Sequence, residues 1–202
     1  MKVLSRALAS SARCLHVLVL IAALVSCRPP EAPETLDDLA SYLFEHTWDE
    51  DDRFLAPGIQ NLDAWLVDHF EETSEGYEVT NISAEAVASV TEESRDLEGL
   101  IGAAVGYDVA IASDEVVDLL LFYDPVEVFP SEYSYYEREF LSDAECFRER
   151  SCPKVELNVS LVANYPLGIT GESETRLQYH WIDTVNGPAA VQRSWTRWQP
   201  TI

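Results

Sequence analysis

Apolar side chains recur every three to four residues in two segments of the first third of the chain. One stripe begins after Thr35, which Asp38 follows by three residues, and the other begins after Asn61. Between them, 48–58 reads as a loop. This period is that of an amphipathic helix, and Thr and Asn are favourable N-cap residues. The pattern therefore predicts two helices, one starting after Thr35 and one after Asn61.

Toward the C-terminus the apolar period becomes that of a strand. Apolar and polar residues alternate over 155–161 and 177–181, and a turn at 185–188 precedes a further strand over 191–198. Alternation with a period of two is typical of strands that bury one face. We therefore expect an antiparallel meander with one solvent-facing side.

The middle of the chain carries weaker signals. Residues 102–112 are rich in small and β-branched side chains, which favours a strand, and Ser113 is placed to cap a helix ending near Tyr123. The tyrosine-rich segment 132–141 favours another strand. Together the segments predict an α+β fold, with N-terminal helices packed on an antiparallel β-sheet.

The expected register of the last strand separates two tryptophans. Trp195 and Trp198 fall on opposite faces, while Tyr179 and Trp181 share the apolar face of the neighbouring strand. One of the two should then be buried and the other exposed. We expect an exposed tryptophan here to pack in a satellite cluster, with a contact point for a partner or a sugar as the alternative.

A different pattern precedes the helices. Residues 1–13 contain Lys2, Arg6 and Arg13 and no acid, and 15–24 form an apolar run. A membrane-spanning helix needs about 20 apolar residues, so this run is too short to remain in a bilayer. A positive segment followed by a short apolar one is typical of a signal peptide.

The apolar run ends in the sequence Leu-Val-Ser-Cys, whose last residue is Cys27. This sequence resembles the lipobox of bacterial lipoproteins. The resemblance implies that 1–26 is a signal peptide and that Cys27 is acylated, with palmitate among its acyl chains, which makes a stable membrane anchor. In lipoproteins of Gram-negative bacteria, an Asp directly after the lipidated cysteine favours retention in the inner membrane. This chain has Arg28 at that position, so the same resemblance implies the outer membrane of the cell envelope. An ordinary secretory signal with a chance cysteine is the alternative.

The proline-rich start of the mature chain predicts an extended tether. We expect the lipidated cysteine and this tether over 27–34, followed by a single α+β domain over 35–202. Cleavage would remove three basic residues and no acid, changing the formal charge from −23 to −26. Such a charge repels phosphate backbones and excludes nucleic acid as a partner. We attribute the acids to solubility, with binding of cations or basic partners as the alternative.

Two cysteines, Cys146 and Cys152, remain in the mature domain. An isolated pair in an oxidising compartment predicts one disulfide. A zinc site would need more ligands, and no histidine is near in sequence. A redox pair would more often have two intervening residues, whereas five separate these cysteines.

The segment 109–133 resembles the opening of helix-grip lipid-binding (START-like) domains, in which a strand leads into a helix and a proline-marked loop. A START-like variant is therefore the alternative fold. Those domains end in a long helix that lines a cavity, whereas this chain ends in an expected strand.

Sequence motifs for catalysis, cofactor binding and metal binding are absent. The histidines His46, His69 and His180 show no metal-ligand spacing, and we place His180 on the polar side of its strand. No serine has a Gly-x-Ser-x-Gly setting. The acidic segment 49–52 lacks the glycine and spacing of a calcium loop. We therefore assign no catalytic, cofactor or metal residue.

These observations favour an envelope-anchored lipoprotein with a non-enzymatic binding or structural role. Its expected partners are the membrane, through the lipid, and a protein or a small hydrophobic ligand. A carrier of a hydrophobic small molecule is the alternative, and a hydrolase without a visible motif is a further one.

Overall fold

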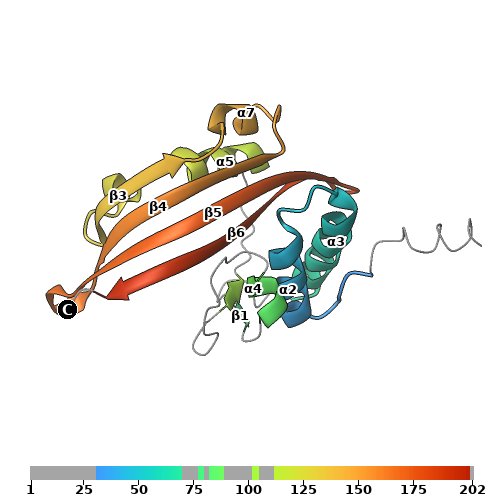
Figure 1. Ribbon diagram of the computed structural model, residues 1–202, viewed down its shortest axis with the longest axis horizontal. Helices are drawn as coiled ribbons and strands as arrows, with labels where there is room; N and C mark the ends of the chain where they lie inside the picture. Colours follow the sequence, from blue (N-terminus) through green and yellow to red (C-terminus); the bar gives the residue numbers. More distant parts are fainter. Residues whose placement is uncertain (1–30, 70–76, 80–81, 89–101, 105–111, 201–202) are drawn as a thin grey trace, which may run out of the picture. The chain divides into compact units, whose positions relative to one another are not determined.

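The computed structural model describes residues 31–69, 77–79, 82–88, 102–104 and 112–200. Its elements follow the chain in the order α2 Leu36–His46, α3 Asp52–Asp68, β1 Tyr77–Val79, α4 Ala84–Ala88, β2 Gly102–Ala104, α5 Ser113–Phe122, α6 Pro125–Val128, β3 Tyr133–Phe140, α7 Ala144–Arg148, β4 Lys154–Asn164, η2 Pro166–Gly168, β5 Thr170–Thr184 and β6 Gly187–Pro200 (Figure 1).

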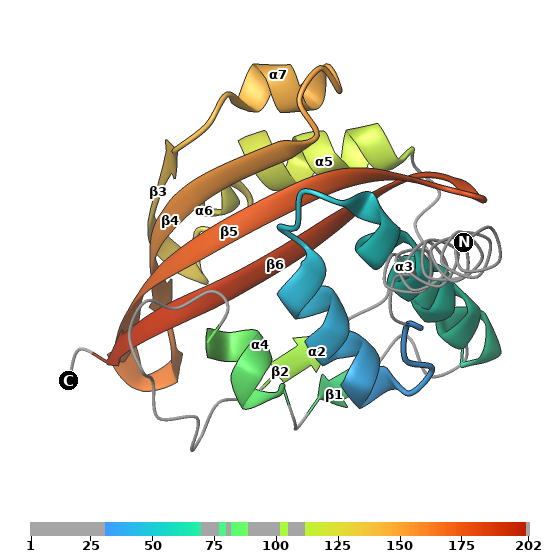
Figure 2. The same ribbon diagram turned by 45° about the vertical axis from the view of Figure 1, so that its right-hand side comes forward.

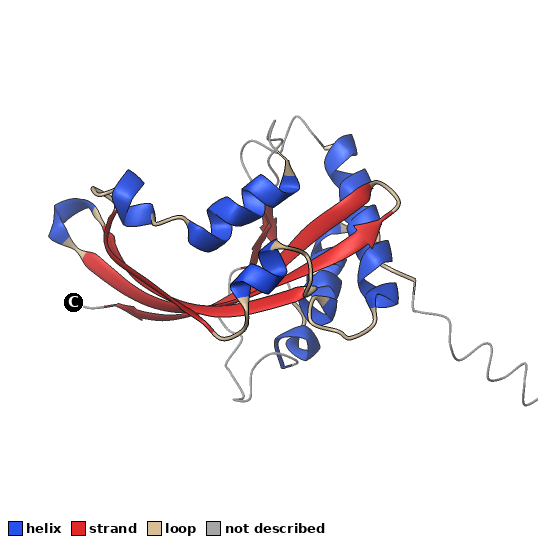
Figure 3. Cartoon of the chain, turned by 90° about the horizontal axis from the view of Figure 1, so that it is seen from above, coloured by secondary structure: helices blue, strands red, loops and turns tan. Residues whose placement is uncertain are grey.

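The centre of the fold is a four-stranded antiparallel sheet in the order β3-β4-β5-β6. Strands β1 and β2 pair separately as a second, two-stranded sheet. Helices together with an antiparallel sheet confirm the predicted α+β class. The long strands β4, β5 and β6 contain the segments 155–161, 177–181 and 191–198, for which strands were predicted, and Figure 3 shows them curving along their length.

Helices cover both faces of this sheet (Figure 2). On one face, side chains of α5 and α7 pack against Leu157, Tyr179 and Trp181 in the larger core cluster. On the other face, Leu43 of α2 and Leu55 of α3 pack against Ile182 of β5. The expectation of one solvent-facing side is therefore wrong for the part of β5 beneath α2 and α3.

Helix α3 begins ten residues earlier than the sequence predicts. Its N-cap is Asp51, whose side chain accepts from the Arg53 amide, and not Asn61. The segment 48–58 reads as a loop because it contains Pro57 and Gly58, yet both lie inside the helix. A Cβ on Gly58 would lie 2.9 Å from Leu43 Cδ2, so the glycine permits close packing of α3 on α2.

Asn61 instead fixes the start of the domain. Its amide nitrogen donates to the carbonyl oxygens of Ala32 and Pro33 at 3.0 and 2.9 Å. Two residues further along α3, Asp63 accepts from the Asn186 side chain in the turn between β5 and β6. The chain therefore enters the domain at the end of the sheet that carries this turn.

The helix α5 begins close to where the sequence places it. Its N-cap is Ala112, which makes no side-chain cap bond, so the prediction of a Ser113 cap is wrong by one residue. Of the strand expected over 102–112, Gly102–Ala104 is a strand, and 105–111 lie outside the described residues.

A disulfide joins Cys146 and Cys152 beside the larger core cluster, with Cα atoms 5.3 Å apart. The Cys146 carbonyl oxygen also accepts from the amides of Ser151 and Cys152, which tightens the turn after α7. The indole of Trp181 donates to the Phe147 carbonyl at 3.2 Å, so α7 is attached to β5. None of the helices that the structure describes is long and apolar enough to cross a membrane.

Candidate functional site

Three basic side chains of the sheet, Lys154 on β4, His180 on β5 and Arg193 on β6, converge on the connection between α2 and α3. We call them the basic triplet. They share one face of the sheet. Lys154 and His180 are register partners, and Arg193 is the register partner of Gln178, which lies two residues before His180 on β5. All three donate to main-chain carbonyl oxygens of residues 44–49.

Arg193 lies at the C-terminus of α2 and is 7% exposed. Its guanidinium donates to the carbonyl oxygens of Phe44 and Glu45 at 2.7 and 3.1 Å, and to Gln178 Oε1 at 2.7 Å. A cation is favourable at this end of a helix because the carbonyl dipoles point toward it. Burial lowers the pKa of Arg193 to about 10, so the side chain stays charged at neutral pH.

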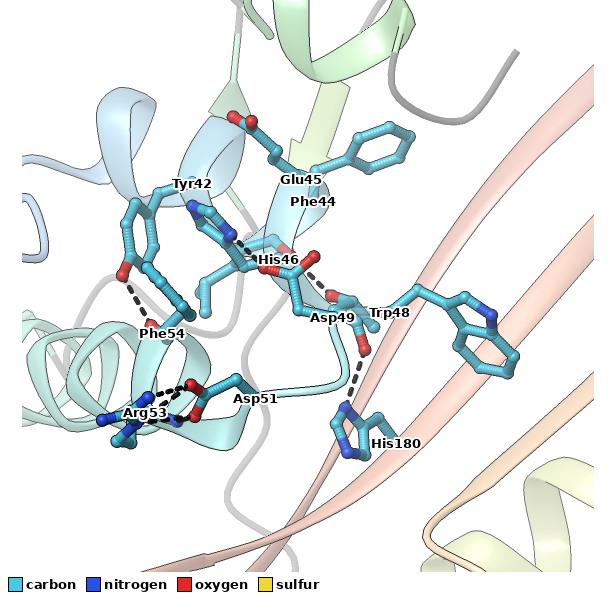
Figure 4. Close-up of polar contacts among 12 residues, drawn as sticks. Tyr42, Phe44, Glu45, His46, Trp48, Asp49, Asp51, Arg53, Phe54 and His180 are labelled. Carbon is cyan, nitrogen blue, oxygen red and sulfur yellow. Dashed lines mark hydrogen bonds and ion pairs between the residues drawn. The ribbon is translucent and has the colours of Figure 1, made fainter. Parts of the chain in front are cut away.

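His180 contacts the loop that follows α2 (Figure 4). Its Nδ1 donates to the Thr47 carbonyl oxygen at 2.8 Å, and its Nε2 lies 3.2 Å from Asp52 Oδ1. Burial lowers the pKa of His180 below its ordinary value, while the Thr47 carbonyl and Asp52 act in the opposite direction. His180 shares a face with Gln178 and Lys154, opposite Trp181, as predicted, but its side chain is 2% exposed, so this face is covered here and does not face solvent.

Lys154 completes the triplet. Its Nζ donates to the carbonyl oxygens of Trp48 and Asp49 at 3.0 and 2.7 Å and lies 5.4 Å from the centre of the Trp48 ring. Arg193 thus satisfies two carbonyl groups that the last turn of α2 leaves without helical partners, while His180 and Lys154 satisfy carbonyl groups of the loop that follows. The arrangement attaches helices to the sheet and is structural.

The other histidines and the acidic segment 49–52 have local partners. His46 Nδ1 lies 2.6 Å from the Asp49 carboxylate, and His69 Nδ1 lies 2.8 Å from the Trp65 carbonyl oxygen. Within the described ranges, no group of three or more His, Cys, Asp or Glu side chains is arranged to hold a metal ion. Cys27, the expected lipidation site, lies outside the described residues.

Trp195 is half-buried and lies opposite Arg176 in the register, with the Arg193 guanidinium 6.0 Å from its ring centre. Trp198 lies opposite Ser173, three residues along the strand and hence on the other face. The side chain of Trp198 lies outside the described residues, so the predicted difference in burial between the two tryptophans stays a prediction.

Exposed apolar side chains gather at the opposite end of the sheet from the entry of the chain. The β4–β5 hairpin and the turn after α6 lie together there, because Asn164 donates through its amide to the Glu132 carbonyl oxygen at 2.7 Å. We define the distal surface by five exposed apolar residues, which lie in these two segments and in the last position of α6: Val128, Phe129, Tyr165, Leu167 and Ile169.

Leu167 is the most exposed member of the distal surface. Its side chain is 98% exposed, and its backbone has a positive φ of 70°. This left-handed conformation costs a branched residue about 1–2 kcal/mol. The hairpin tip therefore presents a leucine in an unfavourable conformation with no burial in the domain to offset the cost.

A hollow of about 250 Å³ lies beside the distal surface. Its wall is formed by Tyr135, Ser160, Leu161, Val162, Glu172, Ser173 and Glu174. A hollow with two carboxylates in its wall does not favour a purely hydrophobic ligand, which the carrier alternative requires. In the sequence, the exposed apolar hairpin is marked by a run of nine residues, 163–171, that contains no charged side chain. The alternation of apolar and polar residues in the strands does not reveal this feature.

Comparisons of the chain with family models, curated proteins and solved structures gave no match.

Proposed function

We propose that the protein is an envelope-anchored lipoprotein with a non-enzymatic binding role, and that the distal surface makes the contact with its partner. The anchor rests on the lipobox resemblance at Cys27. The observation that carries the binding role is the group of exposed apolar side chains at the end of the sheet farthest from the entry of the chain. Exposed apolar patches of this kind mark interaction sites.

The position of this surface suits an anchored protein. Ala32 is attached to α3, and α3 is attached to the β5–β6 turn. From that turn, β5 runs 15 residues toward the distal surface, or about 45 Å at a rise of about 3.3 Å per residue. A lipid on Cys27, only five residues before Ala32, would hold the β5–β6 turn near the bilayer and leave the distal surface far from it.

The energetic reason for a contact is the apolar area left in water. Complete burial of a leucine, isoleucine or phenylalanine side chain stabilises a complex by about 1.5–3 kcal/mol. Phe129, Leu167 and Ile169 are 47%, 98% and 56% exposed. Their burial against a partner is therefore worth several kcal/mol, enough for a specific complex if the partner is complementary in shape.

Photo-crosslinking in the native cells tests this proposal. A photoreactive amino acid at position 167 should give a discrete protein adduct, and the same group at position 185, where Val185 is 83% exposed on the other hairpin, should not. A Cys27→Ala chain should lose both acyl labelling and the adduct. Equal adducts at 167 and 185, or none at 167, would contradict the proposed contact.

A further inference from the structure

Acidic residues outnumber basic ones around the distal surface. Residues 126–137 and 161–175 contain no Lys, Arg or His. They contain five exposed acids: Glu127, Glu132, Glu137, Glu172 and Glu174. The nearest basic side chain of β5, Arg176, lies 3.3 Å from the Glu156 carboxylate and is already paired. On β6, Arg197 is the register partner of Glu174. The apolar side chains are therefore surrounded by five carboxylates with one basic residue opposite one of them, and the net charge of these residues is negative.

This charge pattern disfavours two kinds of partner. A second copy of the chain, docked through the same surface, would bring two sets of five carboxylates together. An anionic bilayer would repel the same carboxylates through the negative potential at its surface. Both contacts would place like charges around a newly buried apolar core, which costs free energy.

The shape of the surface restricts the partner further. Leu167 lies at the tip of a hairpin and is 98% exposed, so it projects from the domain. A projecting leucine is buried only if the partner supplies the concave side of the contact. Beside it, the hollow combines Leu161 and Val162 with the carboxylates of Glu172 and Glu174. Lysine and arginine combine an apolar stem with a charged head, which matches this lining.

We propose that the distal surface binds a protein whose apolar groove is bordered by lysine and arginine side chains. Leu167 and Ile169 enter the groove, and a basic side chain of the partner occupies the hollow beside Glu172 and Glu174. The inference rests on the proposed function and specifies its partner. Opposite charges around an apolar centre raise the rate of association and make binding sensitive to salt.

The test uses the full chain in dodecyl maltoside micelles and a fluorescent 14-residue amphipathic peptide with one leucine face and one lysine face. Peptide binding is read by anisotropy against micelles without protein. A peptide with glutamate in place of lysine is the second probe. We expect the lysine peptide to bind at least tenfold more tightly than the glutamate peptide at low salt, and the preference to shrink at 0.5 M salt.

Two comparisons, each of a variant of the distal surface with a control variant elsewhere, locate the peptide-binding site. Leu167→Ser with Ile169→Ser should weaken lysine-peptide binding at least tenfold, whereas Val185→Ser on the other hairpin should change it less than twofold. The pair Glu172→Gln with Glu174→Gln should weaken it three- to tenfold at low salt. A matched loss of two charges on α2 and α3, Glu45→Gln with Asp68→Asn, should change it less than twofold. All these positions are exposed, and circular dichroism checks that each variant is folded.

Each contrary result overturns the inference in a recognisable way. Equal binding of both peptides would show that charge does not select the partner. Tight binding to vesicles of phosphatidylglycerol and phosphatidylcholine (1:3), lost in the Leu167→Ser, Ile169→Ser variant, would show that the occupant is lipid. Dimerisation lost in that variant would show that it is a second copy. A residue-167 adduct in cells without peptide selectivity would leave the proposed function standing and remove only the partner chemistry.

Discussion

Replacement of Arg193 by methionine should strongly destabilise the domain. Methionine retains much of the apolar stem but removes the three hydrogen bonds from the guanidinium to Phe44, Glu45 and Gln178. The acceptors stay in place, and an acceptor left unsatisfied in a buried site costs about 1–3 kcal/mol. The magnitude depends on how far water can replace the arginine at each acceptor.

The three acceptors differ in this respect. The carbonyl oxygens of Phe44 and Glu45 lie at the partly buried C-terminus of α2, so water replaces Arg193 there at a cost of about 1 kcal/mol each. Gln178 is 6% exposed, and its Oε1 loses a charged donor in the interior. Relief of the desolvation of the cation offsets part of the loss. We expect a net decrease of about 2–4 kcal/mol in the free energy of unfolding.

Urea unfolding of the purified protein, followed by far-ultraviolet circular dichroism, measures this decrease. With an m-value of about 2 kcal/mol per molar urea, the midpoint should fall by about 1–2 M. Arg176→Met is the matched control, because Arg176 is 34% exposed and makes one ion pair, worth below about 1 kcal/mol. Equal midpoints for the two variants would refute the reasoning that the basic triplet attaches α2 to the sheet.

Three further predictions concern other sites. Because burial lowers the folded-state pKa of His180, the unfolded chain binds more protons than the folded one below about pH 6.5, so stability should fall as pH drops below that value. Unfolding free energies at pH 7.0 and 5.5 should therefore differ less in His180→Gln, and an unchanged difference would exclude His180 as the source. Cys27→Ala should yield a soluble or unprocessed protein, and retention of this variant in washed outer membranes would contradict lipid anchoring. Thiol titration of the denatured, unreduced mature domain should find no free sulfhydryl at Cys146 or Cys152, and reduction should cost about 2 kcal/mol of stability; two reactive thiols would contradict the disulfide.

The strands were predictable because their side chains alternate between two environments. Val155, Leu157 and Val159 are buried in one core cluster, and the intervening residues lie on the other face, as a period of two requires. The register of β4 and β5 follows from this demand, because a shift by one residue would expose all three. Local pattern and tertiary packing agree here, and the prediction succeeds.

The start of α3 was not predictable from the same kind of evidence. Pro57 and Gly58 are strong loop signals, and the helix contains both because Gly58 allows α2 to approach closely. The Tyr42 hydroxyl donates to the Phe54 carbonyl oxygen at 2.6 Å across the same contact. Tertiary packing therefore outweighs the loop preference of Pro57 and Gly58, and the local signal for the earlier start is Asp51, a favourable N-cap residue.

The burial of His180 could not be read from its strand either. His180 and Gln178 alternate with Tyr179 and Trp181 as polar residues on a solvent-facing side would. His180 is buried where Thr47, more than a hundred positions earlier in the chain, supplies a carbonyl acceptor, and Gln178 is buried between Glu156 and Arg193, which bond to its amide. A polar face of a strand indicates solvent only where no other segment provides hydrogen-bond partners.

The basic triplet also bears on the distal surface, since it sets where the positive charge of the sheet lies. Lys154 and Arg193 donate to main-chain carbonyls beneath α2, at the part of the sheet nearer the entry of the chain. The segments that carry Leu167 and its neighbouring acids hold no basic residue at all. Strand β6 brings Arg197 opposite Glu174, so this end of the sheet is not free of cations, but its acids outnumber its bases. Three of the basic residues of the sheet are used to attach the helices, and the charge around the exposed apolar end stays negative. A basic partner would be attracted to that end before any apolar contact forms, which makes the salt dependence of its association rate the most direct measure of this polarity.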